Sequence, residues 1–191
     1  MTNILAFAGS ARKDSWNKML VKIAAQGAID AGADVTIVDL ADYPMPLFNQ
    51  DLEAEDGMPE AAAKFKQLLI DHDGFLIASP EYNSAFSPLL KNAIDWASRT
   101  TSDGEAALVA YKGKCAAIMA CSPGGLGGIR GLVFLRMLLG NIGVTVIPDQ
   151  IAIPAAYQAF AADGSLVDGG KQSSVKQIGA KLVEVAGRLR T

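Results

Sequence analysis

Short hydrophobic runs alternate along this chain with longer segments in which hydrophobic residues recur at helical spacing. Each short run is nearly continuous rather than alternating with polar residues, which is typical of strands buried on both faces of a sheet. Five such runs predict five strands, at Ile4–Ala8, Val35–Val38, Gly74–Ala78, Lys114–Ala120 and Val144–Ile147.

The segments between these runs predict helices, because their hydrophobic residues return every three or four positions. Gly32 supplies a helix stop and Pro59 a helix start. The stretch after the second strand contains Pro44 and Pro46 and predicts an irregular connection. The expected helices run from Ser15 to Ile29, from Pro59 to about Ile70, from Ser87 to about Ala97, from Ile129 to about Asn141 and from Ser174 to Leu189.

Strands that alternate with helices in this way predict an α/β fold with a doubly wound, five-stranded parallel sheet between two helical layers. The 191 residues contain no internal repeat and no linker, so we expect a single domain over residues 1–191. In such folds ligands bind beyond the carboxyl ends of the strands. The loops after the first, third and fourth strands are therefore the places to look for chemistry.

Composition narrows the function classes. A chain that is 50% hydrophobic and 19% charged, with net charge −3, is neither disordered nor suited to a nucleic-acid backbone. Every apolar run is shorter than the roughly 20 residues of a membrane span, and no basic and apolar leader opens the sequence, so we expect a cytoplasmic protein. One histidine and two cysteines build neither a metal triad nor a disulfide framework.

The first loop gathers hydroxyl groups, an amide and a guanidinium where a strand gives way to a helix. Ser10, Arg12, Ser15 and Asn17 all fall at this junction. A helix N-terminus presents unpaired N–H groups and a positive dipole end, so the loop suits the oxygens of a phosphate monoester. The alternative is that Ser15 is only a helix cap and that Arg12 is a solvated surface residue.

The third loop places five ligand-capable residues directly after its strand: Pro80, Glu81, Tyr82, Asn83 and Ser84. Proline and asparagine favour a turn, which exposes successive backbone N–H and C=O groups. The pyrimidine edge of an isoalloxazine ring matches such groups, and its flat face accepts an aromatic or apolar neighbour. The alternative is an ordinary β-turn with Tyr82 on the surface.

The fourth loop, residues 122–128, is rich in glycine but matches no common nucleotide motif. Gly125-Leu126-Gly127 begins like a dinucleotide fingerprint, yet Arg130 stands where a third glycine would be. No Gly-Lys-Ser/Thr sequence closes a Walker loop anywhere in the chain. The loops therefore do not predict a dinucleotide fold of the Rossmann type.

Three motifs in order resemble the NADPH-dependent FMN reductase family of flavodoxin-like proteins, which includes quinone, chromate and azo-dye reductases. They are Gly9-Ser10-x-Arg12-x-x-Ser15-x-Asn17, then Pro80-Glu81-Tyr82-Asn83, then the segment from Ser87-Pro88 to Asp95-Trp96. The resemblance spans roughly residues 3–150. Ala85 departs from it, because family members often have serine there.

The resemblance implies which residues bind the cofactor. The serines, arginine and asparagine of the first loop would hold the phosphate of FMN, and the third loop would run along the ring and the ribityl chain. The fourth loop would approach the other side of the ring. The residues concerned are Ser10, Arg12, Ser15, Asn17, Pro80, Glu81, Tyr82, Asn83, Ser84, Ser122, Gly124 and Gly125.

The function expected on this basis is hydride transfer from NADPH or NADH through FMN to a quinone or a similar small acceptor. The flavin does the chemistry in such enzymes, so we assign no catalytic side chain. The alternative is a flavodoxin-type electron carrier or redox sensor without its own substrate. The expected helix from Ile129 carries more apolar residues than one sheet face needs, which with the resemblance predicts a homodimer or homotetramer.

Overall fold

A computed structural model, which describes residues 1–190, places five strands in one parallel sheet with the order β2-β1-β3-β4-β5. Successive neighbours pair in parallel register, from Asn3 opposite Asp34 at one end to Cys121 opposite Ile153 at the other. The doubly wound α/β fold is therefore confirmed. The strands are β1 (Asn3–Ala8), β2 (Asp34–Asp39), β3 (Gly74–Ala78), β4 (Cys115–Cys121) and β5 (Thr145–Ile153).

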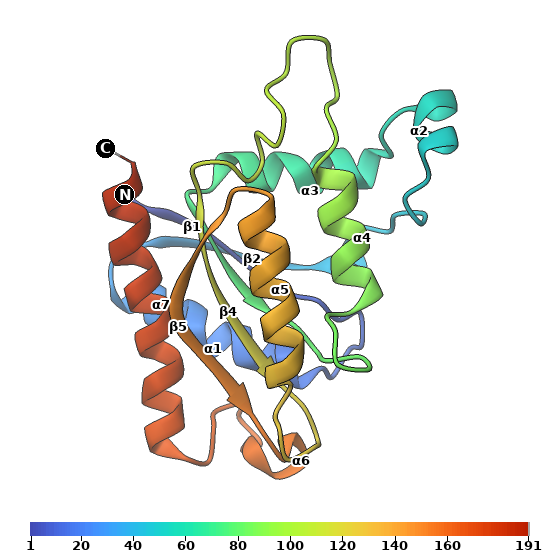
Figure 1. Cartoon of the computed structure of the whole chain (residues 1–191). Helices are drawn as coiled ribbons and strands as arrows, with labels where there is room; N and C mark the ends of the chain where they lie inside the picture. The colour runs from blue at the N-terminus through green and yellow to red at the C-terminus, as the bar shows by residue number, and fades with distance from the viewer. Residues whose placement is uncertain (191) are drawn as a thin grey trace.

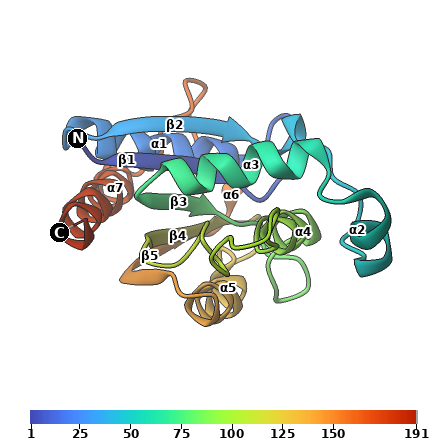
Figure 2. The ribbon, with the colours of Figure 1, turned by 90° about the horizontal axis from the view of Figure 1, so that it is seen from above.

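Helices cover both faces of this sheet (Figures 1 and 2). Side chains alternate between the faces along each strand, so Leu76 packs into one core and its neighbour Ile77 into the other. The first core lies under α1 (Trp16–Asp30) and α7 (Gly169–Leu189). The second core lies under α3 (Glu60–Asp71), α4 (Pro88–Ala97) and α5 (Ile129–Asn141).

The helices α1 and α7 pack against each other at two glycines. A Cβ atom on Gly27 would lie 2.0 Å from the carbonyl oxygen of Lys176, and one on Gly179 would lie 2.0 Å from that of Ala24. No side chain fits in either place, so the two backbones come into direct contact. This contact fixes the position of α1, whose first turn borders the expected phosphate loop.

The two edge strands differ from the expectation of a sheet buried on both faces. Both β2 and β5 expose several side chains, whereas β3 and β4 are buried throughout. The edge position lets β5 continue to Ile153 past Pro148, because an edge strand tolerates a residue that has no N–H to donate. The closing helix is also longer than expected, because Asp168 caps it by accepting a hydrogen bond from the backbone N–H of Lys171.

Three short helical elements do not appear in the hydrophobic pattern. They are a 3-10 turn at Leu40–Asp42, α2 (Gln50–Asp56) and α6 (Ala156–Ala159). Helix α2 buries none of its residues and lies outside the two helical layers (Figure 2), so it has no apolar stripe to reveal it. Asn49 caps its start, and Gly57, with a φ of +76°, ends it.

Among residues 1–190, every helix is too short or too polar to cross a membrane. Helix α5 is the most apolar at its surface. Its residues Val133, Phe134 and Met137 are exposed, while Leu132 and Leu135 are buried against the sheet.

Candidate functional site

The loops that follow β1, β3 and β4 meet at the carboxyl edge of the sheet, toward the bottom of Figure 1. Together they enclose an open cleft of about 170 Å³. The residues that line it are Ser10, Arg12, Ser15, Trp16, Asn17, Pro80, Glu81, Tyr82, Cys121, Ser122 and Pro123.

The first loop, residues 9–15, presents polar groups without partners. Ser10 and Ser15 are buried, with 7% and 3% of their surface exposed, and neither hydroxyl has a hydrogen-bond partner among residues 1–190. Ser15 is the cap residue of α1, yet its side chain forms no capping bond. Among residues 1–190 no buried side-chain oxygen lacks a partner, so both of these hydroxyl oxygens are accessible from the open cleft. Free hydroxyls beside a helix N-terminus suit an anion, because they and the helix N–H groups can donate to it.

Arg12 stands at the rim of the same loop. Its guanidinium carbon lies 5.0 Å from the centre of the Trp16 ring, and it has no ion pair among the described residues. Stacking on an aromatic face orients a guanidinium while leaving its N–H groups free to donate. Trp16 was not among the residues expected from the sequence. Its position between Ser15 and Asn17 was the available signal.

The backbone of the first loop rests on the start of α4. The hydroxyl of Ser87 donates to the carbonyl of Gly9 at 2.5 Å and accepts from the backbone N–H of Leu90 at 3.2 Å. A Cβ atom on Gly9 would lie 2.9 Å from the Cβ atom of Leu90. Glycine is therefore needed for this close approach, and Ser87 joins the first loop to the third.

Asn17 joins the first loop to the fourth. Its Nδ2 donates to the carbonyl of Cys121, and its Oδ1 accepts from the N–H of Cys121, both at 2.9 Å. The residue lines the cleft, as expected, but both ends of its amide are engaged within the protein. Asn17 therefore holds the first turn of α1 against the end of β4.

The third loop forms a tight turn. Tyr82 and Ala85 exchange two backbone hydrogen bonds of 2.8 and 3.1 Å around Asn83 and Ser84. Both central residues have left-handed φ angles, of 51° and 71°, which is the pattern of a type I′ turn. The expected turn is present, and its first part, Pro80 to Tyr82, faces the cleft.

The side chain of Glu81 binds the start of α5. Its Oε1 accepts from Nε and from a terminal nitrogen of Arg130, at 2.9 and 2.5 Å, and its Oε2 accepts from the N–H of Gly131 at 3.1 Å. Burial alone would raise the pKa of this carboxyl. The hydrogen bonds and charge of Arg130, together with the N–H of Gly131, outweigh burial and hold the pKa below its usual range.

Four of the expected residues do not line the cleft. Asn83 and Ser84 form the far end of the third-loop turn, and Gly124 and Gly125 are exposed in the fourth loop. The fourth loop instead contributes Ser122 and Pro123, which lie directly after β4. Pro123 and Cys121 were not expected, although both flank Ser122 in the sequence.

The thiols are not nucleophiles in this site. Burial raises the pKa of Cys121 to about 12, and that of Cys115, with a contribution from the charge of Asp73, to about 11. A nucleophilic cysteine needs a thiolate at neutral pH. Both residues therefore serve as small buried side chains, as the sequence indicated.

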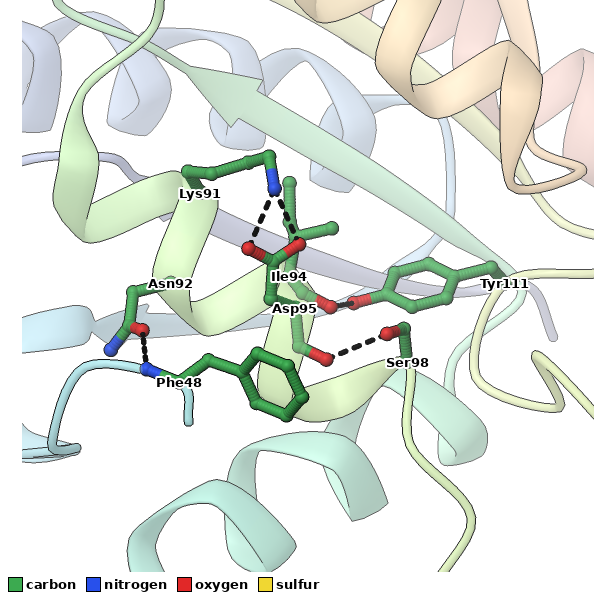
Figure 3. A network of polar contacts seen from close by, with 7 residues as sticks. All are labelled: Phe48, Lys91, Asn92, Ile94, Asp95, Ser98 and Tyr111. Carbon is green, nitrogen blue, oxygen red and sulfur yellow. Dashed lines mark hydrogen bonds and ion pairs between the residues drawn. The ribbon is translucent and has the colours of Figure 1, made fainter. Parts of the chain in front are cut away.

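The third family motif, on α4, contacts other parts of the chain rather than the cleft (Figure 3). Asn92 accepts at Oδ1 from the N–H of Phe48 at 2.8 Å, which fastens the segment before α2 to the helix. On another side the hydroxyl of Tyr111 donates to the carbonyl of Ile94 at 3.0 Å. These residues hold α4, and through Ser87 they also support the first loop.

A larger hollow of about 470 Å³ lies beside β2, but its charged groups are balanced. Lysines 13, 18 and 22 share it with Asp14, Asp39 and Asp42. Lys18 is already paired with Asp39 at 2.5 Å. The cleft at the carboxyl edge, with its unpartnered hydroxyls, is the better ligand site.

The cleft fits FMN on the chemistry of its donors. Two unpartnered hydroxyls that face the cleft and an unpaired guanidinium suit a phosphate, because all three can donate to its oxygens. The turn beside them offers backbone groups to a flat ring.

Comparisons with known proteins also point to a flavin-dependent reductase. The family model described as NADPH-dependent FMN reductase matches residues 2–158. An NAD(P)H-dependent FMN reductase of Pseudomonas aeruginosa is 33% identical over 175 residues, which cover 91% of this chain and 89% of that protein. An NADPH:quinone oxidoreductase of Arabidopsis thaliana is 33% identical over 183 residues, covering 93% and 88%.

The fold is shared with a solved flavoenzyme. FerB of Paracoccus denitrificans, an NAD(P)H:(acceptor) oxidoreductase, superposes with a TM-score of 0.82 and is 29% identical, with 98% of each chain covered.

Proposed function

Because this chain belongs to the NADPH-dependent FMN reductase family, we propose that it is an FMN-dependent NAD(P)H oxidoreductase that reduces quinones or similar small acceptors. The observation that carries the proposal is the pair of hydroxyls of Ser10 and Ser15 at the start of α1, which face the cleft and have no partner among residues 1–190. A phosphate there would satisfy both hydroxyls and the positive end of the helix.

The residues of the cleft divide into two ends. Ser10, Arg12 and Ser15 bind the phosphate, while Asn17 fixes the helix turn beside them through Cys121. At the other end, the backbone from Pro80 to Tyr82 faces the ring on one side, and Ser122 with Pro123 faces it on the other. When bound, FMN supplies the chemistry of hydride acceptance and electron delivery. The chain supplies orientation and needs no general acid or base.

The decisive measurement uses the purified protein alone. We expect it to bind FMN in a fluorescence titration and to oxidise NADPH with a benzoquinone and no protein partner. Absence of turnover despite tight FMN binding would indicate an electron carrier or sensor instead.

The kinetic pattern tests how the loops crowd the ring. Loops on both sides leave one open face, on which two flat molecules cannot stack together, so NAD(P)H and the acceptor should take turns. A steady-state matrix of NADPH against a benzoquinone should then give parallel double-reciprocal lines. Intersecting lines would require a second binding surface.

We also propose that the protein is a cytoplasmic homodimer or homotetramer. The exposed Val133, Phe134 and Met137 of α5 support an interface, because exposed apolar side chains on one helix gain from being covered. Light scattering should give a multiple of 20.0 kDa, and Met137→Lys should shift it toward the monomer. A wild-type monomer at micromolar concentration would contradict the proposal.

The proposed cytoplasmic location has separate support. Cys115 and Cys121 are free and buried, which agrees with a reducing compartment.

A further inference from the structure

Each pair of loops at the cleft is joined by one polar side chain. Ser87 joins the first loop to the third, and Asn17 joins the first to the fourth. Glu81 joins the third loop to the fourth, through the helix that the fourth loop enters. Of the three side chains, only that of Glu81 is charged.

We propose that Glu81 is a positioning residue for the ring end of the flavin site, which it shapes by holding the third-loop turn against α5 rather than by binding FMN with its carboxylate. The inference rests on the proposed placement of FMN in the cleft. It assigns to the side chain of Glu81 a different role from the ligand role implied by the family motif.

The hydrogen bonds show why the carboxylate is unavailable to a ligand. Both oxygens are engaged by the start of α5, and only 7% of the Glu81 side chain is exposed. The N–H of Gly131 belongs to the first turn of the helix, where a negative charge is stabilised by the helix dipole. The backbone of Glu81 still lines the cleft, so the side chain and the backbone have separate tasks.

The start of α5 is shaped to receive this turn. A Cβ atom on Gly131 would lie 3.2 Å from the carbonyl oxygen of Ala85 and 3.4 Å from the Cβ atom of Glu81. The helix therefore sits close against the turn without side chains of its own in between. Among residues 1–190, Glu81 provides the only hydrogen bonds between the turn and α5.

The turn needs such support, because its conformation is unfavourable for the residues that adopt it. Ser84 has a φ of 71°, in a region that L-residues other than glycine, asparagine and aspartate rarely occupy. Such a conformation persists only where the surrounding structure holds it. Without the carboxylate, the turn would be free to relax and its backbone groups would lose their alignment with the ring.

The test compares Glu81→Gln with Glu53→Gln, using FMN and riboflavin as probes. Glu53 pairs with Arg99 at 2.7 Å in a similar half-buried contact, but on α2 and away from the cleft. We expect Glu81→Gln to weaken the binding of FMN and riboflavin by the same factor, roughly 10-fold, as for a lost hydrogen bond between charged groups. Glu53→Gln should leave both affinities unchanged.

A double-mutant cycle shows whether Glu81 acts through its partner. Arg130→Ala leaves the bond to Gly131 intact and should cost less affinity than Glu81→Gln. The double variant should then bind flavin no more weakly than Glu81→Gln alone. Additive losses would overturn the inference, since they would mean that the two side chains act separately on the ligand.

The other possible results of these titrations also test the role proposed for Glu81. Wild-type affinity of Glu81→Gln for both flavins would overturn the inference, and so would a loss confined to FMN, which would place Glu81 at the phosphate. A lower thermal midpoint of the apoprotein, matched by Glu53→Gln, would reduce the effect to general stability. Failure of the proposed site has a separate signature, in which Arg12→Ala binds FMN as wild type does.

Discussion

Buried polar residues at the amino and carboxyl ends of the strands, here called the amino edge and the carboxyl edge of the sheet, differ in whether they have partners within the protein. At the amino edge, Lys66 is buried and donates to the carboxylate of Glu105 at 2.6 Å and to the carbonyl of Arg99 at 2.8 Å. At the carboxyl edge, Ser10 and Ser15 are just as buried and have no partner among residues 1–190. The polar side chain at the amino end is paired within the protein, whereas the hydroxyls at the carboxyl end are free to bind a ligand.

The rest of the amino edge follows the same rule. Lys114 donates to the carbonyls of Ile70 and His72, and the imidazole of His72 contacts the carbonyl of Leu68 and the hydroxyl of Thr36. The only histidine of the chain is therefore structural. Residue type alone does not mark a functional group. A better indication is a polar group that lines a cleft and has no partner within the protein.

The largest expected effect is a loss of stability when the buried ion pair at the amino edge is removed. Lys66→Met removes the charged partner of the largely enclosed carboxylate of Glu105, which keeps only its hydrogen bonds from Thr101, and we expect the free energy of unfolding to fall by about 3 kcal/mol. FMN affinity of the folded protein should stay unchanged. Lys64→Met on the same helix removes only an exposed pair with Glu60 and should leave the denaturation midpoint in place. A weakened FMN affinity in Lys66→Met would show that the two edges are not independent.

Asn17→Ala is expected to affect both stability and binding, because Asn17 belongs to the cleft and to the framework. It would leave the N–H and the carbonyl of Cys121 without partners, at a cost of about 2 kcal/mol in unfolding free energy. FMN affinity should fall as well, since the first turn of α1 loses its anchor. Urea denaturation and flavin titration on the same preparation separate the two losses, and unchanged stability would contradict the role given to Asn17.

Arg12→Ala sharpens the comparison, because it should change binding and leave stability alone. Loss of a charged hydrogen bond to the phosphate should weaken FMN binding by about 2 kcal/mol. Riboflavin, which lacks the phosphate, should be affected far less. Equal losses for the two ligands in parallel titrations would rule out Arg12 as a phosphate contact.

Lowering the pH should also reduce the stability of the protein through Glu105 at the amino edge, by a smaller amount than Lys66→Met. The hydrogen bond from Lys66, with that from the N–H of Thr101, holds the pKa of Glu105 below its usual range despite burial. Below the ordinary glutamate value of about 4.3, the unfolded chain therefore binds protons before the folded one does, and stability falls as the pH falls. Denaturation curves should be constant between neutral pH and about 5 and then shift to lower denaturant. Glu105→Gln should flatten that loss, whereas Glu55→Gln, at an exposed position, should not.

Local patterns in the sequence predicted the parts of the molecule that depend on local interactions. Continuous apolar runs gave β3 at the bounds observed, and helical spacing with a Ser-Pro start gave α4 to within a residue. The turn at residues 80–84 was likewise predicted from its own residues. Helix α2 could not be predicted in this way, because it has no buried face and its ends are set by Asn49 and Gly57.

The sequence by itself determined the parallel sheet, the three loops and eight of the residues that line the cleft at its carboxyl edge. Only the tertiary structure decided what each member does there. Asn17 and Glu81 carry the same motif signal as Ser10 and Arg12, yet their side chains are satisfied by residues about 104 and 50 positions away. Whether a polar group finds a partner within the protein depends on which distant backbone reaches it, and this is fixed only when the helices pack on the sheet.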